Sequence, residues 1–387
     1  MADGQCPCDE NAAKTEEGEE KMSNKPIIDE ETVNIDLEKK ELVIIDQTKL
    51  PGKTNIIRLK TAQEIWEAIY LLKVRGAPAI GIAAALGMYI LAEQIQAKDF
   101  DGFYREFQQK KEYLDSARPT AVNLSWALKR MESVCLKNRK KAVGEILEAL
   151  KQEALRLREE DIQVCRKIGE YGLTLVKPGD GILTHCNAGR LAAIRYGTAT
   201  APIYLGQERG YDFKVFVDET RPLLQGARLT AHELHLAGIE VTLICDNMSA
   251  MVMKNGWVNA VFVGCDRVAA NGDTANKIGT SVVAAVAKRY KIPFYVCAPT
   301  ATIDMNLESG NRIPIEERKP EEITRMWYKE QMAPKGVKVY NPAFDVTDND
   351  LITAIITEYG IVRAPYREAF EEIFRKIKKE ENDPASN

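Results

Sequence analysis

The sequence predicts an α/β protein in which an open, mostly parallel sheet domain follows a smaller, largely helical N-terminal domain. The length of 387 residues is enough for two domains. Apolar residues recur at three- and four-residue spacing through much of the first 160 residues, as they do in amphipathic helices. From about residue 170 onward, short β-branched runs alternate with helical patterns, and this alternation favours parallel strands joined by right-handed crossovers.

The predicted boundaries divide the chain into an extension, two domains and a tail. Residues 1–29 are polar and acidic, and we expect a disordered extension there because few large apolar side chains are available for packing. The helical N-terminal domain is expected over 30–160, the α/β domain over 161–375 and a polar tail over 376–387.

The N-terminal domain shows little regular alternation, so its predicted structure is mostly helical. Helices are expected over 64–76, 77–94, 121–138 and 141–172. The segment 77–94 holds the longest apolar run, but it is rich in Ala and Gly and ends in charged residues. A buried helix is therefore favoured over a membrane span, which needs about 20 apolar residues.

The second domain alternates strands with helices. Strands are expected over 179–187, 213–220, 240–247, 259–269 and 293–304. The intervening helices are expected over 190–210, 223–238, 249–256 and 276–291. Several of these helical patterns end on glycine, which is the residue that most often terminates a helix.

Composition excludes several classes of protein. A net charge of −4 argues against a protein that binds nucleic acid through a basic face. No apolar run is long enough for a membrane span and the N-terminus lacks the apolar core of a signal peptide, so no membrane association is expected. Eight cysteines are too sparse for a disulfide scaffold, and a cytoplasmic location is the simplest expectation.

Polar side chains follow the predicted strands at the point where each strand ends. The segments are 185–187, 218–221, 245–247, 265–267 and 300–302. In open parallel sheets, ligands bind outside the carboxyl ends of the strands. A single polar residue at such a place is often a helix cap, but a series of them along one sheet edge indicates a binding site.

Three kinds of chemistry fit this predicted edge. A metal site could use Cys186, Cys245, Cys265 and His185, but no C-x-x-C or H-x-x-x-H pair brings two of these ligands together locally. A dinucleotide site would need a G-x-G-x-x-G turn and a P-loop would need G-x-x-x-x-G-K, and neither is present. The remaining hypothesis is a thiol–carboxylate pair, Cys186 with Asp266, that moves a proton or hydride on a small substrate.

Basic residues next to predicted helix starts indicate a phosphorylated substrate. Arg75 precedes Gly76 and Ala77 at the start of one helix, and small residues there let the backbone approach an anion. Arg118 stands before another helix start, and Lys277 is expected in the first turn of a third helix. The alternative is that these are surface charges near helix caps.

Together these residues resemble the methylthioribose-1-phosphate isomerases. The shared motifs are "RGAPAIG", "RPTAVNL", "THCNAG", "ETRPLLQGARLT", "GCDRVAANGDTANKIGT" and "IPIEER". They run in family order and cover nearly everything from about residue 40 to about residue 370. The resemblance implies a small N-terminal domain on a Rossmann-like catalytic domain, and an isomerase that converts an aldose 1-phosphate into a ketose 1-phosphate in methionine salvage.

The resemblance also implies roles for individual residues. Cys186 would be the catalytic thiol and Asp266 the proton donor. The positions that match the family's substrate-binding residues are Arg75, Gly76, Ala77, Arg118, Gln225, Asn276 and Lys277. Family members are typically homodimers and need no metal or nucleotide, so a sugar phosphate substrate and a second copy of the chain are the implied partners.

Three departures from the family pattern leave alternatives open. Arg190 follows "CNAG" where a small residue is usual, Cys265 replaces the usual alanine before Asp266, and Asn247 is also less usual. An arginine near the thiol could change the substrate preference, so 5-deoxyribose 1-phosphate and ribose 1,5-bisphosphate are alternative substrates. A non-catalytic alternative is a protein like the regulatory subunits of the translation-initiation guanine-nucleotide exchange factor, but the presence of both Cys186 and Asp266 argues against it.

Overall fold

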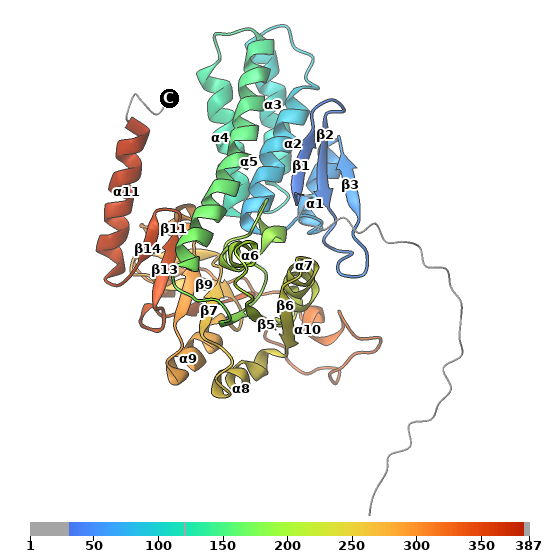
Figure 1. Cartoon of the computed structure of the whole chain (residues 1–387). Helices are drawn as coiled ribbons and strands as arrows, with labels where there is room; N and C mark the ends of the chain where they lie inside the picture. Colours follow the sequence, from blue (N-terminus) through green and yellow to red (C-terminus); the bar gives the residue numbers. More distant parts are fainter. Residues whose placement is uncertain (1–30, 120, 383–387) are drawn as a thin grey trace, which may run out of the picture.

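The computed structural model describes residues 31–119 and 121–382. The expected disordered extension at 1–29 lies outside the described residues, as does Thr120. A bundle of long helices with a small sheet forms the upper part of the molecule in Figure 1, and the large sheet with its helices forms the lower part. No helix in the described ranges is long and apolar enough to cross a membrane.

The N-terminal part begins with an antiparallel sheet that the sequence did not predict. Its strands, in the order β1-β2-β3, are β1 (Val33–Asp36), β2 (Glu41–Ile45) and β3 (Ile56–Leu59). The residues of β1 and β3 are mostly not buried and include polar side chains, so the sequence lacks the series of apolar runs that marked the predicted strands. Val33, Leu42 and Ile44 are buried in the same apolar core as the neighbouring helices, so the sheet is held by tertiary packing.

Five helices follow this sheet. They are α1 (Ala62–Tyr70), α2 (Ala77–Ala92), α3 (Phe100–Asp115), α4 (Val122–Lys137) and α5 (Val143–Leu173). Helix α2 is buried along nearly its whole length, which explains why it is apolar on all sides. Helix α3 was not predicted, because only Phe103, Phe107 and Leu114 in this largely polar segment are fully buried.

A seven-stranded sheet forms the centre of the C-terminal part, and it confirms the predicted mostly parallel α/β domain. The strand order is β14-β13-β10-β7-β4-β5-β6, and all neighbours are parallel except β14 beside β13. The strands are β4 (Gly181–Thr184), β5 (Lys214–Asp218), β6 (Glu240–Ile244), β7 (Ala260–Val263), β10 (Phe294–Cys297), β13 (Ala354–Thr357) and β14 (Gly360–Val362).

The helices of this part are shorter than the sequence predicted. They are α6 (Ala201–Glu208), α7 (Ala231–Leu236), α8 (Ser249–Lys254) and α9 (Thr280–Tyr290). The helix predicted over 190–210 is wrong in its first half, where only a short 3₁₀ turn, η2 (Arg190–Ala192), forms. Tyr196 and Gly197 have positive φ, and this left-handed backbone interrupts any helix before Ala201.

A four-stranded sheet lies beside the large one and changes the position of a predicted site residue. Its strands are β8 (Arg267–Ala269), β9 (Thr274–Lys277), β11 (Ile303–Asp304) and β12 (Phe344–Thr347), in the order β11-β8-β9-β12. The single strand predicted over 259–269 is therefore two strands, β7 and β8. Lys277 ends β9 and is not in the first turn of a helix as predicted, because α9 begins at Thr280.

The last element of the described residues is a helix that extends past residue 376, where a polar tail is predicted to begin. A short helix, α10 (Glu321–Thr324), lies in the irregular segment before β12. Helix α11 (Tyr366–Asn382) is amphipathic, and its Tyr366, Phe370 and Ile373 are buried against the large sheet's core. A polar sequence such as 376–382 forms a helix here because the apolar face of the preceding turns is already docked.

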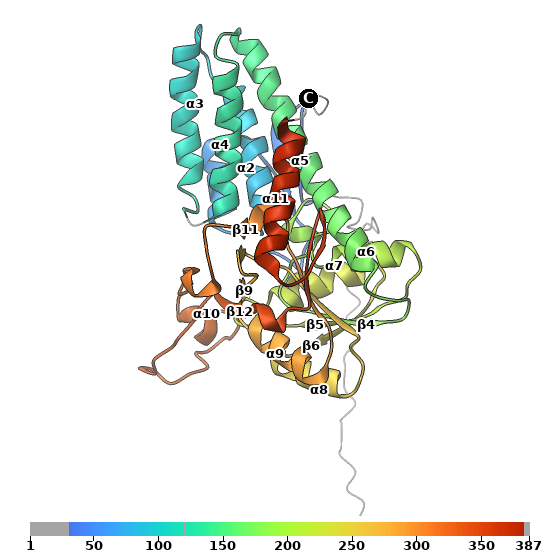
Figure 2. The same cartoon turned by 90° about the vertical axis from the view of Figure 1, so that its left-hand side faces the viewer.

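Helix α5 joins the two parts of the molecule, and the predicted boundary at 160/161 falls inside it. It packs on α2 and α4 at one end and on α6 and β13 at the other, as Figures 1 and 2 show. The start of α2 comes close to the 3₁₀ turn η2, which lies just after β4. The N-terminal part thus brings the Arg75 segment to the carboxyl end of the large sheet.

Candidate active site

Cys186 lies directly after β4, where the chain turns sharply. Its φ of +66° is in the left-handed region, which is costly for a residue with a side chain and is often found at functional sites. Its backbone N–H donates to Thr220 Oγ1 at 2.8 Å, and its carbonyl accepts from Thr230 Oγ1 at 2.6 Å. The residue is only 9% exposed, so the surrounding chain holds the thiol in one orientation.

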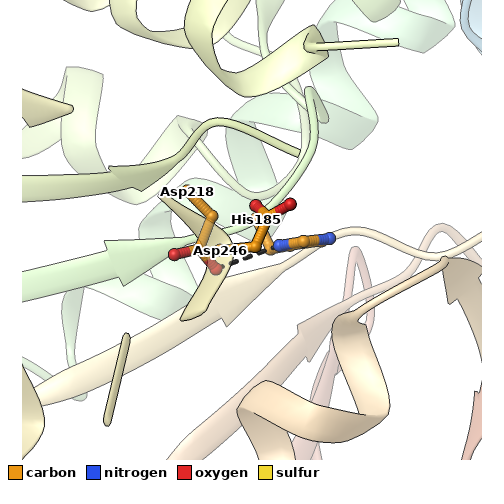
Figure 3. Close-up of side chains that lie close together, drawn as sticks. All are labelled: His185, Asp218 and Asp246. Carbon is orange, nitrogen blue, oxygen red and sulfur yellow. Dashed lines mark hydrogen bonds and ion pairs between the residues drawn. The ribbon is translucent and has the colours of Figure 1, made fainter. Parts of the chain in front are cut away.

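His185, the residue before Cys186, belongs to a network with Asp218 and Asp246, which lie close to it in Figure 3. His185 Nδ1 lies 3.0 Å from Asp218 Oδ2, and His185 Nε2 lies 2.9 Å from the carbonyl oxygen of Ile278. Both ring nitrogens face hydrogen-bond acceptors, and only the imidazolium form, which has a proton on each nitrogen, can donate to both. Burial opposes this charge, but Asp218 and Asp246 outweigh the burial and raise the pKa of His185.

His185, Asp218 and Asp246 are the described residues closest to a metal-binding arrangement, with ligand atoms within 4.8 Å of one another. Their ligand atoms already have partners, however. Asp246 accepts from the backbone N–H groups of Thr220 and Arg221, each at 2.7 Å, and Asp218 accepts from Ser249 at 2.8 Å. The arrangement is therefore a hydrogen-bonded support for the strand ends.

The cysteine-containing metal site considered from the sequence is not assembled within the described part of the chain. The group of three ligand atoms found there contains no cysteine, and Cys245 is exposed to solvent. Cys265 packs with its Sγ 3.3 Å from Thr302 Oγ1, and burial raises its pKa to about 12. Cys265 is thus an unreactive thiol beside Asp266.

Asp266 follows β7 and Gly264, and its backbone N–H donates to the carbonyl of Ala275 at 2.9 Å. Its side chain is accessible to solvent, yet the protein around it is dense enough for desolvation to raise its pKa. Lys277, Arg75 and Arg118 act in the opposite direction. Asp266 is therefore a carboxyl group that keeps its proton more readily than an ordinary aspartate while it stays reachable by a substrate.

Cys186 and Asp266 are electrostatic neighbours, although they follow different strands. Burial raises the pKa of Cys186, Lys277 and Arg75 lower it, and Asp266 raises it further. The structure thus brings the predicted thiol, the predicted acid and two of the predicted cations together at one edge of the parallel sheet. Desolvation of this kind is typical of groups that transfer protons.

The three predicted phosphate-binding cations lie around this pair with few partners of their own. Arg75 donates through Nε to Gln47 Oε1 at 3.2 Å and through Nη2 to the carbonyl of Asn187 at 2.9 Å. Among the described residues, neither Arg118 nor Lys277 forms a side-chain hydrogen bond or ion pair, although Lys277 Nζ lies 4.5 Å from the centre of the Phe344 ring. Partly buried cations without a counter-ion favour a bound anion.

Gly76 and Ala77 form the start of α2 beside Arg75. Gly76 precedes the helix with a φ of +90°, and a Cβ added to it would lie 2.4 Å from the Cα of Ala192. Only glycine allows this contact between the two parts of the chain. The N-terminus of a 16-residue helix therefore points its backbone N–H groups into the same region as Arg75.

Gln225 and Asn276 are the remaining residues predicted to bind the substrate. Gln225 follows β5, is 7% exposed, and its Oε1 has no hydrogen-bond partner in the described part of the chain. Asn276 lies on β9 next to Lys277, and its Nδ2 donates to Thr280 Oγ1 at 3.1 Å. A buried acceptor without a partner is costly, so the Gln225 amide is available to a bound ligand.

Several residues that shape the site were not chosen from the sequence. Gln47 comes from the unpredicted N-terminal sheet region and orients Arg75, and no sequence signal marks it. Asn187 was noted as a polar strand end, but its contacts depend on the fold. Arg190, for which an effect on substrate preference was the alternative to pointing away from the site, is 4% exposed and lies in the electrostatic surroundings of the buried Glu233.

The chain matches the model of one protein family and is similar to several named proteins. The model of the Initiation factor 2 subunit family matches residues 73–364. The chain is 66% identical to a methylthioribose-1-phosphate isomerase of Symbiobacterium thermophilum over 89% of this chain and 96% of that protein. It is 56% identical to a 5-deoxyribose 1-phosphate isomerase of Clostridium botulinum over 87% of this chain and 96% of that protein.

Two solved structures have the same fold. One is 5-methylthioribose 1-phosphate isomerase from Pyrococcus horikoshii OT3, with a TM-score of 0.86 and 42% identity over 92% of this chain and 99% of that chain. The other bears the name of translation initiation factor eIF-2B, subunit delta, from A. fulgidus, with a TM-score of 0.83 and 43% identity over 89% of this chain and 99% of that chain.

Proposed function

The chain belongs to the Initiation factor 2 subunit family, and within it we propose an aldose–ketose isomerase that converts 5-methylthioribose 1-phosphate to 5-methylthioribulose 1-phosphate in methionine salvage. The proposed activity rests mainly on the desolvated pair Cys186 and Asp266. This pair lies among cations that have few partners in the protein. Relatives that are 66% and 64% identical bear the name of this activity.

The substrate determines what the site must do. Because a phosphate on C1 prevents a free aldehyde, the bond between C1 and the ring oxygen O4 must break first, and O4 must gain a proton. Hydrogen then moves from C2 to C1, and the hydroxyl on C2 loses its proton as the ketone forms. Asp266 has a raised pKa, so it is suited to donate the proton to O4 and to accept one back from the C2 hydroxyl.

Cys186 has one of two roles, depending on the route of the hydrogen. If a base removes the proton from C2 through an enediol phosphate, Cys186 is that base. If the hydrogen shifts as hydride, Cys186 stabilises the reacting carbons without transferring the proton. Its buried surroundings limit water access, which favours either route. Burial raises the pKa of the thiol, and Lys277 and Arg75 offset part of that increase, so they make the thiolate that the first route needs less unfavourable than burial alone would.

The group on C5 separates the candidate substrates. A methylthio group is apolar, and a bare methyl in its place should cost about 10–200-fold in kcat/KM, since one missing apolar group is worth that much in a fitted pocket. Relatives named for 5-deoxyribose 1-phosphate make that compound the second candidate. Ribose 1,5-bisphosphate ranks last, because Arg190, the cation suspected of meeting a second phosphate, lies buried near Glu233.

The non-catalytic alternative has its own support in the family name and in the structure named for an initiation factor subunit. A regulatory subunit needs neither a desolvated thiol nor a carboxyl group poised among cations, and this chain has both. We therefore place the chain with the enzymes of the family.

A panel of sugar 1-phosphates tests the proposal. We expect kcat/KM to fall in the order 5-methylthioribose 1-phosphate, 5-deoxyribose 1-phosphate, ribose 1,5-bisphosphate. A preference for the bisphosphate that disappears in Arg190→Ala would reverse the ranking and assign Arg190 a role. No turnover of any of the three compounds by folded protein would favour the non-catalytic alternative.

The remaining parts of the proposal concern assembly and location. We include a homodimer, as the family resemblance implies, and light scattering of the purified chain tests it. We also include a cytoplasmic location, which the free thiols of the six described cysteines fit, since thiols stay reduced there. The chemistry described above requires no metal or nucleotide.

A further inference from the structure

Glu233 on α7 is a buried carboxylate that the proposed reaction does not use. It is 1% exposed. Its Oε1 accepts a hydrogen bond from Asn187 Nδ2 at 2.9 Å, and its Oε2 accepts one from the backbone N–H of Leu191 at 3.1 Å. Each carboxylate oxygen of Glu233 accepts a hydrogen bond from an N–H donor. Protonation of either oxygen where it faces its donor would therefore break that hydrogen bond.

Asn187 connects this carboxylate to the candidate active site. Its Nδ2 also donates to Thr230 Oγ1 at 2.9 Å, and Thr230 in turn donates to the carbonyl of Cys186 at 2.6 Å. On its other side, the Oδ1 and the carbonyl oxygen of Asn187 both accept from Arg75 Nη2. A continuous series of hydrogen bonds therefore runs from Glu233 through Asn187 to Arg75.

The chain after Cys186 is wrapped closely around Glu233. A Cβ added to Gly189 would lie 1.5 Å from Glu233 Oε1, so glycine is required for the segment to reach the carboxylate. Arg75 retains its Nη1 without a hydrogen-bond partner among the described residues, while Nε and Nη2 are held by Gln47 and Asn187. Two contacts thus fix the guanidinium and leave one edge available for an anion.

We propose that Glu233 is a positioning residue that, through Asn187, holds the Arg75 guanidinium in the orientation that binds the phosphate of the substrate. This inference rests on the proposed function, because it assumes that the anion at Arg75 is the phosphate of a sugar 1-phosphate. It adds a residue outside the predicted catalytic and substrate-binding set.

The surroundings of Glu233 make this arrangement sensitive to pH. Burial raises the pKa of Glu233 to about 7, although the Leu191 N–H, Arg190, Asn187 and Arg75 lower it. Tyr204 is the other titratable group facing it, and its own pKa is raised well above the usual value by burial. Protonation of Glu233 below neutral pH would break one of its two hydrogen bonds and release Asn187 or Leu191.

Glu233→Gln tests the inference, because a glutamine amide offers one acceptor and one donor where the carboxylate offers two acceptors. We expect KM for the best sugar 1-phosphate to rise by about 10–100-fold at pH 8, the usual effect of a lost charge-assisted hydrogen bond, with a smaller change in kcat. Arg75 would bind the phosphate equally well in the ground state and in the transition state. Loss of this interaction should therefore raise KM more than it lowers kcat.

A comparison across pH separates this role from a structural one. Wild-type KM should rise as the pH falls from 8 to 6, and the ratio of the variant's KM to the wild-type KM should shrink toward one. Titration of the substrate phosphate affects both enzymes alike and cancels in this ratio. A ratio that stays constant with pH would contradict the proposed ionisation of Glu233.

Two further variants act as controls. Glu153→Gln changes another buried carboxylate, which binds Arg130 and Arg156 on the N-terminal helices, and it should leave KM unchanged whatever its effect on stability. Asn187→Ala should raise KM as Glu233→Gln does, and the double variant should be no worse than the more severe single one, since both changes break the same connection. Additive effects, or a normal KM in Glu233→Gln, would overturn the inference.

Binding of inorganic phosphate, measured by calorimetry, separates this inference from the proposed function. If the wild type turns over none of the sugar phosphates but Glu233→Gln and Asn187→Ala still weaken phosphate binding relative to Glu153→Gln, the proposed function fails and the positioning role stands. If the wild type is an active isomerase and phosphate binding is equal in all variants, the positioning role fails alone.

Discussion

Cys186 and Asp266 differ from ordinary cysteines and aspartates because both are desolvated next to the same cations. Burial raises the pKa of each group, and Lys277 and Arg75 oppose that effect at both. At neutral pH, a carboxyl group of this kind is a better proton donor than a solvated aspartate. In the proposed mechanism, Asp266 therefore donates the proton and Cys186 acts on the hydrogen at C2, either as base or as stabilising group.

Cys186→Ser removes the thiol with almost no change of shape. We expect kcat to fall by at least about 10²-fold, the usual contribution of an acid–base group. The cations remain in place, so KM should change little. Steady-state kinetics with 5-methylthioribose 1-phosphate measure both values, and near-normal turnover would show that the thiol has no chemical role.

Asp266→Asn keeps the size of the side chain but removes the transferable proton. We expect turnover to collapse by at least about 10²-fold while the melting temperature changes little, because desolvation already disfavours the charged form of this residue. Circular dichroism melting and kinetics measure the two effects. Substantial activity in a folded Asp266→Asn protein would remove Asp266 from the mechanism.

The site residues that could be chosen from the sequence are those whose role depends on local position. Cys186 and Asp266 follow β-branched runs directly, and Arg75 precedes a helix start, so their neighbours in the sequence mark them. Gln47 and Glu233 could not be chosen in this way. Gln47 reaches Arg75 only because the N-terminal sheet packs beside α2, and Glu233 is buried only because the segment after Cys186 folds back on it.

At the level of elements, strands with apolar runs that end in polar residues and helices with strong periodicity were predictable, and elements without these patterns were not. The parallel strands β4, β5, β6, β7 and β10 were located from such runs. The strands β1–β3 are equally short, but β1 and β3 are mostly not buried and carry polar side chains, so no such series of runs marks them. The segment 193–200 was wrongly predicted as helix. In that segment, apolar side chains are buried by tertiary contacts around a left-handed turn, which periodicity cannot distinguish from a helix.

The start of α2 is sensitive to substitution because it lies in close contact with the segment after β4. Gly76→Ala places a Cβ within 2.4 Å of Ala192 at a residue with a φ of +90°. We expect a loss of about 1–3 kcal/mol of stability from this strain, and a lower kcat/KM because Arg75 and the helix N-terminus must shift.

Gly144→Ala is the matched control for this change. Gly144 lies in α5, and a Cβ added there would meet nothing within 4 Å. Alanine favours a helix over glycine by up to about 1 kcal/mol, so this variant should be as stable as the wild type or more stable, with normal kinetics. If both variants melt alike, the close contact at Gly76 does not limit stability.

On the scale of the whole molecule, contacts between the two parts of the chain converge on the segments flanking the site. Arg228, in the π-helical turn η3 (Gly226–Thr230) before α7, donates to the carbonyls of Gln47 at 3.2 Å and Leu50 at 3.1 Å in the N-terminal part. Thr32 donates through Oγ1 to the carbonyl of Arg190 at 2.8 Å. The placement of Arg75 relative to Cys186 therefore depends on how the helical part docks on the sheet.

Asp161 on α5 lies at this junction and makes the docking sensitive to pH. Its Oδ2 accepts from the backbone N–H of Ile194 at 2.9 Å, and burial raises its pKa to about 7 despite that bond. An unfolded aspartate titrates near 4, so deprotonation of Asp161 is less favourable in the folded chain, and its contribution to stability falls as the pH rises from about 4 to about 7.

Asp161→Asn keeps an oxygen acceptor for Ile194 but cannot ionise. We expect the variant to melt at a higher temperature than the wild type at pH 8 and at nearly the same temperature at pH 5. Calorimetric melting across this range measures the difference, and a wild type that melts at a higher temperature than the variant at pH 8 would show that Asp161 is ionised and stabilising in the folded chain.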